Sequence, residues 1–225
     1  MIWTIPNILT IGRLIAAPCI ALVFVAFERP LADWLAFCIF VGAAITDFFD
    51  GWLARKLDQV SELGKMLDPI ADKAMVVIAL IAVFFRDTGR PIVDAGEVQW
   101  REINEYTVWL IVPAILIAYR EVFVSGVREF LGDIKLPVTT LAKLKTTVQM
   151  LAIGLLFSVE PFRAMIPETG LRSADYPAAL GSVDWATNVL LIGTIALWIA
   201  AILTIATGWD YFRKALRHLN EREAT

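Results

Sequence analysis

Six long apolar blocks limit what this sequence can fold into more than any other feature does. A helix rises about 1.5 Å per residue, so about 20 apolar residues cross the roughly 30 Å hydrocarbon core of a bilayer. The blocks cover residues 8–27, 31–53, 63–85, 106–130, 141–159 and 185–208. Hydrophobic residues make up 58% of the chain, against about 45–50% in a soluble domain. The sequence therefore predicts an all-α integral membrane protein with six transmembrane helices.

The basic residues predict how these helices are oriented. Six spans place both termini on the same side of the membrane. The connections near residue 28, over 86–105 and over 160–184 carry six of the 20 Lys and Arg residues, and the opposite ends carry the rest. The positive-inside rule then places both termini in the cytoplasm. Because the first block has no basic leader and is longer than a signal-peptide core, we expect a retained span and a bacterial inner (cell) membrane protein.

The remaining composition excludes several other classes. The two cysteines, Cys19 and Cys38, form no CxxC pair and are accompanied by a single histidine, so a Cys/His zinc site is not expected. There is no Walker A loop, Rossmann glycine pattern or HExxH motif. We find no linker or internal repeat, and predict one domain over residues 1–225 with no nucleic-acid partner. The segment 210–225 reads as a basic extension of the last helix that contacts anionic lipid headgroups.

Four aspartates interrupt the second and third apolar blocks. They are Asp47, Asp50, Asp68 and Asp72. An ionised aspartate at membrane depth costs several kcal/mol, so such residues indicate a functional site. At 100° per residue, the first two share one helical face, and the last two share a face four residues apart.

The short connection between the two helices makes them antiparallel, and this sets the depth of each carboxylate. Asp47 and Asp72 each lie eight residues from the connection, which is about 12 Å along a helix. Asp50 and Asp68 pair at a shallower level. We therefore expect four carboxylates to converge in one cleft that is open to the cytoplasm.

Four neighbouring carboxylates repel one another unless a cation binds them. Oxygen ligands suit Mg²⁺ or Mn²⁺, and two divalent cations suit four carboxylates better than one. Two metals held in this way stabilise the attacking and leaving oxygens in a displacement at phosphorus. The alternative is a set of structural ion pairs in which Arg55, Lys65 and Lys73 neutralise the aspartates.

Small residues next to the carboxylates leave room for a nucleotide. Gly51 and Gly64 have no side chain on the predicted cleft face, so a ligand can approach the backbone, and Ala54 keeps the same face small. Arg55 lies at the cytoplasmic mouth, where a guanidinium engages phosphate or holds the loop.

The stretch DFFDGWLAR, eight further residues and GKMLDPIAD resembles a known signature, D-x2-D-G-x2-A-R-x8-G-x3-D-x3-D, at all eight fixed positions. On this basis the chain is identified as a member of the CDP-alcohol phosphatidyltransferase family. IPNILTIGR at 5–13, REVFVSGVRE at 120–129 and KLKTTVQM at 143–150 resemble the branch that makes phosphatidylglycerol phosphate. Together these motifs cover about the first 150 residues.

The resemblance implies six transmembrane helices around a polar cleft at the cytoplasmic interface, in a homodimer. It implies that Asp47, Asp50 and Asp68 hold the metals, and that Asp72 takes the proton from the acceptor hydroxyl while also reaching a metal. The donor would be CDP-diacylglycerol, the acceptor sn-glycerol 3-phosphate and the leaving group CMP.

Basic residues in the fourth and fifth blocks agree with a phosphorylated acceptor. Arg120 and Arg128 share a helical face, and Lys143 and Lys145 begin the next block on the same side. Arginine binds phosphate through two nitrogens. Glu121 is the expected ion-pair partner of Arg120 or of a neighbouring base. The alternative for the lysines is anchoring at the membrane interface.

Three polar residues of the first block also share a face. Asn7, Thr10 and Arg13 recur at steps of three and are placed to reach the diphosphate or cytidine of the donor. Asn7 has a second interpretation as a helix N-cap.

These residues predict a direct displacement, in which Asp72 deprotonates the acceptor hydroxyl and its oxygen attacks the phosphorus attached to diacylglycerol. Two alternatives remain open at this point. The same reaction would run with inositol phosphate, serine or phosphatidylglycerol as acceptor, or the aspartates would form the transit site of a cation transporter.

Overall fold

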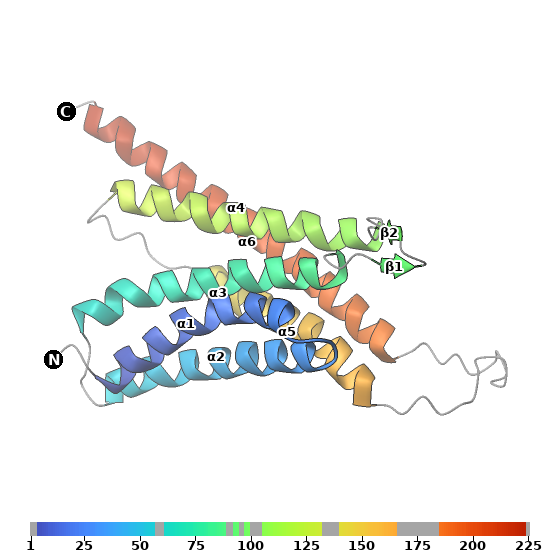
Figure 1. Cartoon of the computed structure of the whole chain (residues 1–225). Coiled ribbons are helices and arrows are strands. Elements are labelled where there is room, and N and C mark those ends of the chain that lie inside the picture. Colours follow the sequence, from blue (N-terminus) through green and yellow to red (C-terminus); the bar gives the residue numbers. More distant parts are fainter. Residues whose placement is uncertain are drawn as a thin grey trace. The chain divides into compact units, whose positions relative to one another are not determined.

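The computed structural model describes residues 4–56, 61–88, 92–94, 97–99, 105–131, 140–165 and 185–223 (Figure 1). The described part contains six helices and one pair of short strands. In chain order these are α1 (Ile5–Ala26), α2 (Leu31–Lys56), α3 (Glu62–Thr88), β1 (Ile92–Asp94), β2 (Glu97–Gln99), α4 (Glu105–Leu131), α5 (Thr140–Met165) and α6 (Trp185–Glu223).

The chain divides into two compact units. The first contains Met1–Val83 and Ile153–Gly193, and the second contains Phe84–Ala152 and Thr194–Thr225. The first unit therefore holds α1, α2, most of α3, the second half of α5 and the start of α6. The second holds α4, the first half of α5 and the rest of α6.

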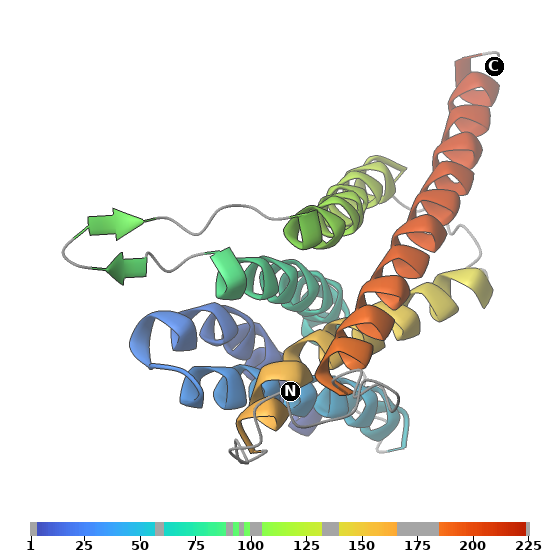
Figure 2. The same cartoon turned by 90° about the vertical axis from the view of Figure 1, so that its right-hand side faces the viewer.

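In the first unit α1 packs against α2, and the two lie side by side in both views (Figures 1 and 2). Thr4 is the N-cap of α1, because its hydroxyl accepts a hydrogen bond from the Asn7 amide at 3.4 Å. The interpretation of Asn7 as the N-cap is therefore wrong. Phe40 of α2 meets Phe157 of α5 with ring centroids 5.6 Å apart, and both rings are buried.

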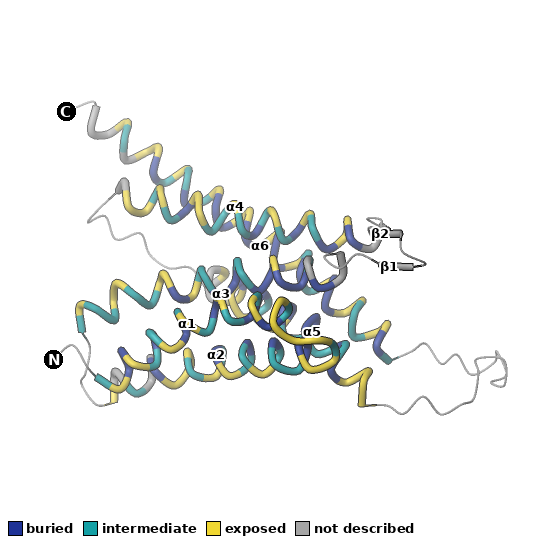
Figure 3. The backbone as a smooth tube through the Cα atoms, viewed as in Figure 1, coloured by how far each residue is buried: buried dark blue, intermediate teal, exposed yellow. Residues whose placement is uncertain are grey.

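The surface of the helices is apolar while several buried positions are polar, as expected for a protein solvated by lipid. Ile15, Leu22 and Val25 of α1 are exposed, whereas Thr10 and Arg13 of the same helix are buried (Figure 3). Apolar side chains on the outside face lipid, while buried polar and charged side chains such as Arg13 are kept away from it. With five helices long and apolar enough to cross a bilayer, the chain is a multi-pass membrane protein.

The structure confirms the six predicted helices, but in the described part of the chain only five of them are long and apolar enough to be candidate membrane spans. The candidate spans among the described residues lie in α1, α2, α4, α5 and α6, and α3 is not one of them. The reason is the charge in its first half, where Lys65, Asp68, Asp72 and Lys73 precede a short apolar run. The residues that predict the site therefore also break the hydropathy signal of their own helix.

One further feature departs from the expected fold, and another agrees with it. The connection 86–105 was expected to be a loop, but it contains an antiparallel strand pair in which Ile92 lies opposite Gln99 and Val93 lies opposite Val98. β-branched residues favour extended backbone, which accounts for this pair. The remaining described elements are helices, so the all-α prediction holds apart from this local strand pair. As predicted, α6 continues past its apolar span, and its 39 residues measure roughly 58 Å.

In the second unit α4 runs beside α6, and side chains join them along their length. The Trp198 indole donates a hydrogen bond of 2.9 Å to the carbonyl oxygen of Trp109, and their rings meet edge to face. Towards the other end of α4, the Arg128 guanidinium donates to the Tyr211 hydroxyl at 3.0 Å and lies over its ring.

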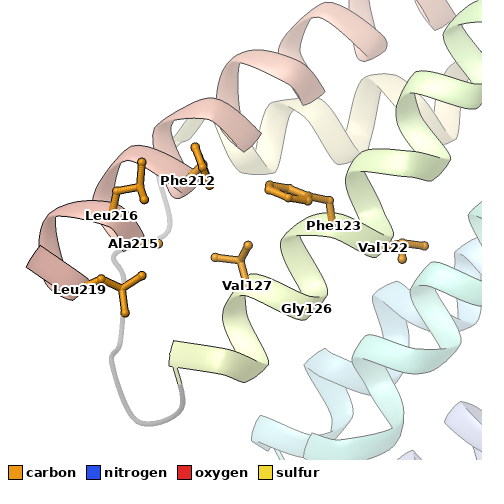
Figure 4. Close-up of a pocket in the computed structure, with 8 residues that line it drawn as sticks. All are labelled: Val122, Phe123, Gly126, Val127, Phe212, Ala215, Leu216 and Leu219. Carbon is orange, nitrogen blue, oxygen red and sulfur yellow. The ribbon is translucent and has the colours of Figure 1, made fainter.

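An apolar groove of about 400 Å³ follows the same pair of helices (Figure 4). It is lined by Val122, Phe123, Gly126, Val127, Phe212, Ala215, Leu216 and Leu219. Its lining side chains carry no titratable group, so this groove does not perform the chemistry predicted from the sequence.

The turn between α1 and α2 contains an ion pair with one buried partner. Arg29 Nε and Nη2 donate to the two oxygens of Asp33 at 2.6 and 3.1 Å, and Asp33 is buried. We expect Arg29→Gln to lower the free energy of unfolding by about 1–3 kcal/mol, because a buried carboxylate loses its charged partner. Thermal unfolding of the purified protein in detergent measures this.

Arg163→Gln is the matched control, because Arg163 is exposed and lies 4.0 Å from Glu160. A pair at this distance with an exposed arginine contributes little to stability. Glu160 also lies 3.6 Å from Arg29 Nη2, so both substitutions remove one neighbour of Glu160 and only Arg29→Gln removes the partner of Asp33. Equal destabilisation by both substitutions would contradict the assignment of Asp33 as a carboxylate that depends on Arg29.

Candidate active site

The guanidinium of Arg13 lies among all four of the predicted aspartates. It is 3% exposed and reaches from α1 towards α2 and α3. Nη1 donates to Asp47 and, at 2.7 Å, to Asp72. Nη2 donates to Asp50 at 2.8 Å and lies 3.7 Å from Asp68. The convergence of the four carboxylates predicted from helical spacing is therefore confirmed.

The pairing by depth is confirmed as well. Asp47 and Asp72, expected at one level, share Nη1, while Asp50 and Asp68, expected at another, both approach Nη2. The identity of the cation was not expected. The sequence placed Arg13 near the donor diphosphate, and the alternative of structural ion pairs named Arg55, Lys65 and Lys73. Of these, Lys65 pairs with Glu62 at 2.7 Å.

The four carboxylates differ in their access to ligands. The side chain of Asp50 is 6% exposed, whereas those of Asp47, Asp68 and Asp72 are 48, 50 and 54% exposed. Three of the four thus present oxygens outside the protein interior while Arg13 contacts them from within. Burial of one carboxylate and exposure of three gives a site that a cation or phosphate compound can reach.

The donor set has the chemistry of a magnesium or manganese site, since it offers only carboxylate oxygens. In the described residues no group of three or more acidic, histidine or cysteine side chains is arranged around a point that a metal ion would occupy. The oxygens instead surround the guanidinium of Arg13. The four aspartates are therefore residues of the type that binds divalent cations, but in this structure their side chains are arranged around Arg13.

Thr10 and Asn7 extend the polar face of α1 towards the start of α3. The Thr10 hydroxyl lies 2.7 Å from Asp68 and 3.5 Å from Asp50. The Ser61 hydroxyl donates to the Asn7 side-chain oxygen at 2.7 Å and accepts from the Gly64 amide at 3.0 Å. The common face predicted for Asn7, Thr10 and Arg13 is confirmed, and all three are buried.

The second unit contains a separate cluster of opposite charges. Both Arg120 and Lys145 contact the same carboxylate oxygen of Glu121, Arg120 at 3.5 Å, and all three side chains are largely buried. This confirms the expectation that Glu121 pairs with Arg120 or a neighbouring base. Arg120 Nε is buried and has no hydrogen-bond partner within the described ranges.

Three residues of α6 support this cluster and were missed from the sequence. The Thr207 hydroxyl lies 3.2 Å from Arg120 Nη2, and Tyr211 accepts from Arg128. Gly208 lies against Arg120, because a Cβ there would be 3.1 Å from its Cγ. Their sequence signal was weak, since the sixth apolar block carries no charge and matched the family pattern only in hydropathy.

Four predicted site residues cannot be placed in the same way. Gly51, Ala54 and Arg55 lie in α2 and Lys143 lies in α5, but their side chains fall outside the described part of the structure. Their assignments to the donor and acceptor sites stay predictions.

The profile of the CDP-alcohol phosphatidyltransferase family matches residues 3–206 of the chain. The match covers the helices that carry all four aspartates, Arg13 and the cluster around Glu121. The chain belongs to the CDP-alcohol phosphatidyltransferase family.

Relatives that match over almost their full length share one printed name, CDP-diacylglycerol–glycerol-3-phosphate 3-phosphatidyltransferase. The protein from Cereibacter sphaeroides is 47% identical over 99% of this chain and 100% of its own. The protein from Rickettsia bellii is 40% identical over 95% and 96%, and that from Pectobacterium atrosepticum is 32% identical over 98% and 100%.

Gly64 permits the hydrogen bond between α1 and the start of α3. A Cβ at this position would lie 2.9 Å from the Asn7 side-chain oxygen and 3.2 Å from the Ser61 hydroxyl. We expect Gly64→Ala to lower the free energy of unfolding by about 1 kcal/mol, because the lost hydrogen bond outweighs the better helix propensity of alanine. Gly42→Ala, where a Cβ meets nothing within 4 Å, should be neutral or stabilising. Thermal unfolding of both variants measures the difference, and equal behaviour would contradict the close approach.

Proposed function

We propose that this protein transfers the phosphatidyl group of CDP-diacylglycerol to sn-glycerol 3-phosphate, releasing CMP and phosphatidylglycerol phosphate. The observation that carries the proposal is the convergence of Asp47, Asp50, Asp68 and Asp72 on one guanidinium. Full-length relatives named for this reaction support it.

The four carboxylates are proposed to hold two divalent cations, Mg²⁺ or Mn²⁺. When bound, these cations neutralise the donor diphosphate and stabilise the attacking and leaving oxygens of the displacement. The exposed sides of Asp47, Asp68 and Asp72 support access of cations to the site. Asp50 lies in α2 and is buried, so its carboxylate has the most fixed position of the four.

Asp72 is proposed to act as the general base. It accepts the proton of the acceptor hydroxyl, whose oxygen attacks the phosphorus attached to diacylglycerol as the bond to the CMP oxygen breaks. A single displacement of this kind inverts the configuration at phosphorus.

The polar face of α1 and the small residues of α2 and α3 are proposed to bind the donor. Asn7, Thr10 and Arg13 line the same face as the carboxylates, and Arg13 Nε is buried without a partner among the described residues. On the basis of the sequence motif, four further residues are proposed to bind the same donor nucleotide: Gly51, Ala54, Arg55 and Gly64.

The cluster in the second unit is proposed to bind the phosphate of the acceptor, through Arg120, Arg128, Lys143 and Lys145. An unpartnered, buried Nε on Arg120 supports this, because a phosphate oxygen satisfies such a donor. Glu121 contacts Lys145, and Thr207 contacts Arg120, so these two residues position the basic side chains that would surround the phosphate.

We further propose that α3 crosses the membrane, making six spans around a polar cleft at the cytoplasmic interface. Asp68 and Asp72 in its charged first half contact the buried Arg13, which lowers the cost that would otherwise oppose insertion. Both termini are assigned to the cytoplasm of a bacterial inner membrane by the positive-inside rule. The family match across both units supports one domain over residues 1–225, and the homodimer remains a proposal from the family resemblance.

The two alternative functions predict different observations. A transporter would place its carboxylates at interrupted helices, whereas α2 continues through Asp47 and Asp50, and α3 through Asp68 and Asp72. Inositol phosphate, serine and phosphatidylglycerol as acceptors are distinguished by competition in the same assay.

The central prediction concerns CMP release by the purified protein in detergent. With CDP-diacylglycerol and Mg²⁺ we expect release that depends on sn-glycerol 3-phosphate. Asp72→Asn should slow it by roughly 10²–10⁴-fold, because the amide cannot accept the proton. Glu62→Gln on the same helix is the control, since Glu62 is 90% exposed, and should leave the rate unchanged. CMP release only with another alcohol would show that the acceptor is not sn-glycerol 3-phosphate. The absence of CMP release with any alcohol would contradict the proposal that the protein is this enzyme.

A second prediction tests the acceptor site. Gly208→Ala adds a methyl group against the Arg120 side chain, so we expect a roughly tenfold higher KM for sn-glycerol 3-phosphate and little change in kcat. Gly126→Ala, where a Cβ meets nothing within 4 Å, should leave KM unchanged. Steady-state kinetics that show the same KM for Gly208→Ala and the parent protein would contradict the role of Arg120.

A further inference from the structure

We propose that Arg13 is an internal counter-cation that competes with the divalent metals for the four aspartates, so that metal binding requires its guanidinium to withdraw. The inference rests on the metal site proposed above. It concerns a role for Arg13, which lies outside the eight fixed positions of the family signature.

The contacts of Arg13 are the first reason. Its Nη1 and Nη2 together approach oxygens of Asp47, Asp50, Asp68 and Asp72, with three hydrogen bonds and one contact at 3.7 Å. These are the oxygens that a metal ion would need. Arg13 occupies one oxygen of each carboxylate. Mg²⁺ binds carboxylate oxygens at about 2.0–2.1 Å, so a metal held between these four groups would come close to the guanidinium and compete with it for their oxygens.

Charge gives the second reason. A guanidinium stays protonated at every physiological pH, so Arg13 cannot reduce its repulsion of a nearby divalent cation by losing a proton. The relief available is movement of the side chain, which is long and attached to α1, while the carboxylates are on α2 and α3. Withdrawal leaves the guanidinium available to the diphosphate of the donor.

Thr10 keeps part of the site in place during such an exchange. Its hydroxyl lies within hydrogen-bond distance of Asp68 at 2.7 Å and Asp50 at 3.5 Å. These contacts come from the same helix as Arg13 but do not depend on it. Asp50 on α2 and Asp68 on α3 therefore keep a partner on α1 when the guanidinium leaves.

The test is Mn²⁺ binding to the full-length protein in detergent, without donor or acceptor, measured from the electron paramagnetic resonance signal of free Mn²⁺. Arg13→Gln removes the competing charge, so we expect its Kd for Mn²⁺ to fall by on the order of tenfold or more. In EDTA the variant should melt at a lower temperature than the parent, and Mn²⁺ should raise its melting temperature further than it raises that of the parent.

Arg29→Gln is the control, because it also removes an arginine paired to a buried aspartate in the same unit. It should lower the melting temperature and leave the Kd for Mn²⁺ unchanged. If Arg13→Gln does not fold, Arg13→Lys keeps a positive charge but not the two-nitrogen fork, and a smaller gain in affinity is expected.

The outcomes separate this inference from the proposed function. Tighter Mn²⁺ binding by the Arg13 variants supports it, and so does binding by Arg13→Gln with none by the parent. Equal or weaker binding by folded Arg13 variants, with binding by the parent, overturns the inference and leaves the metal site standing. Absence of binding in the parent and in every variant overturns both.

Discussion

The first unit depends on one interaction, the contact of a single guanidinium with four carboxylates. Without a cation between them, Asp47 and Asp50 on α2 would repel Asp68 and Asp72 on α3 and hold the two helices apart. Arg13 links both helices to α1, and the Thr10 hydroxyl adds a hydrogen bond to Asp68 from the same face. The packing of three helices and the position of the reactive groups are therefore set by the same few atoms.

The same interaction explains why α3 is so unlike its neighbours in hydropathy. A helix that carries five charged residues in its first half is poorly suited to lipid on its own. Two of those charges, Asp68 and Asp72, are half-exposed but contact the buried Arg13, so a cation inside the protein offsets part of their cost. These charges keep α3 from having the hydropathy of a membrane span on its own, and the contact with Arg13 supports the proposal that it spans the membrane as part of a packed set of helices.

Much of the site follows from sequence alone because helical spacing fixes which residues share a face. That was enough to predict the convergence of four aspartates and their pairing by depth, and to place Arg120 near Glu121. Spacing within a helix does not fix which side chain of a third helix enters between two others, so the partner of the aspartates was missed. The support given by Thr207 and Gly208 was missed for the same reason, together with the lack of any charge in their apolar block.

Both charged clusters combine an internal partner with a group that we propose contacts a ligand. Glu121 contacts Arg120 and Lys145 in the second unit, as Arg13 contacts the aspartates in the first. An internal partner keeps charged side chains at defined positions, and this preorganisation lowers the reorganisation needed when a ligand arrives. It also opposes ligand binding, since the partner must give up contacts first. Because a buried charge without a partner costs more than either effect, an enzyme that works with diphosphates and metals at a membrane surface is expected to carry its own counter-ions.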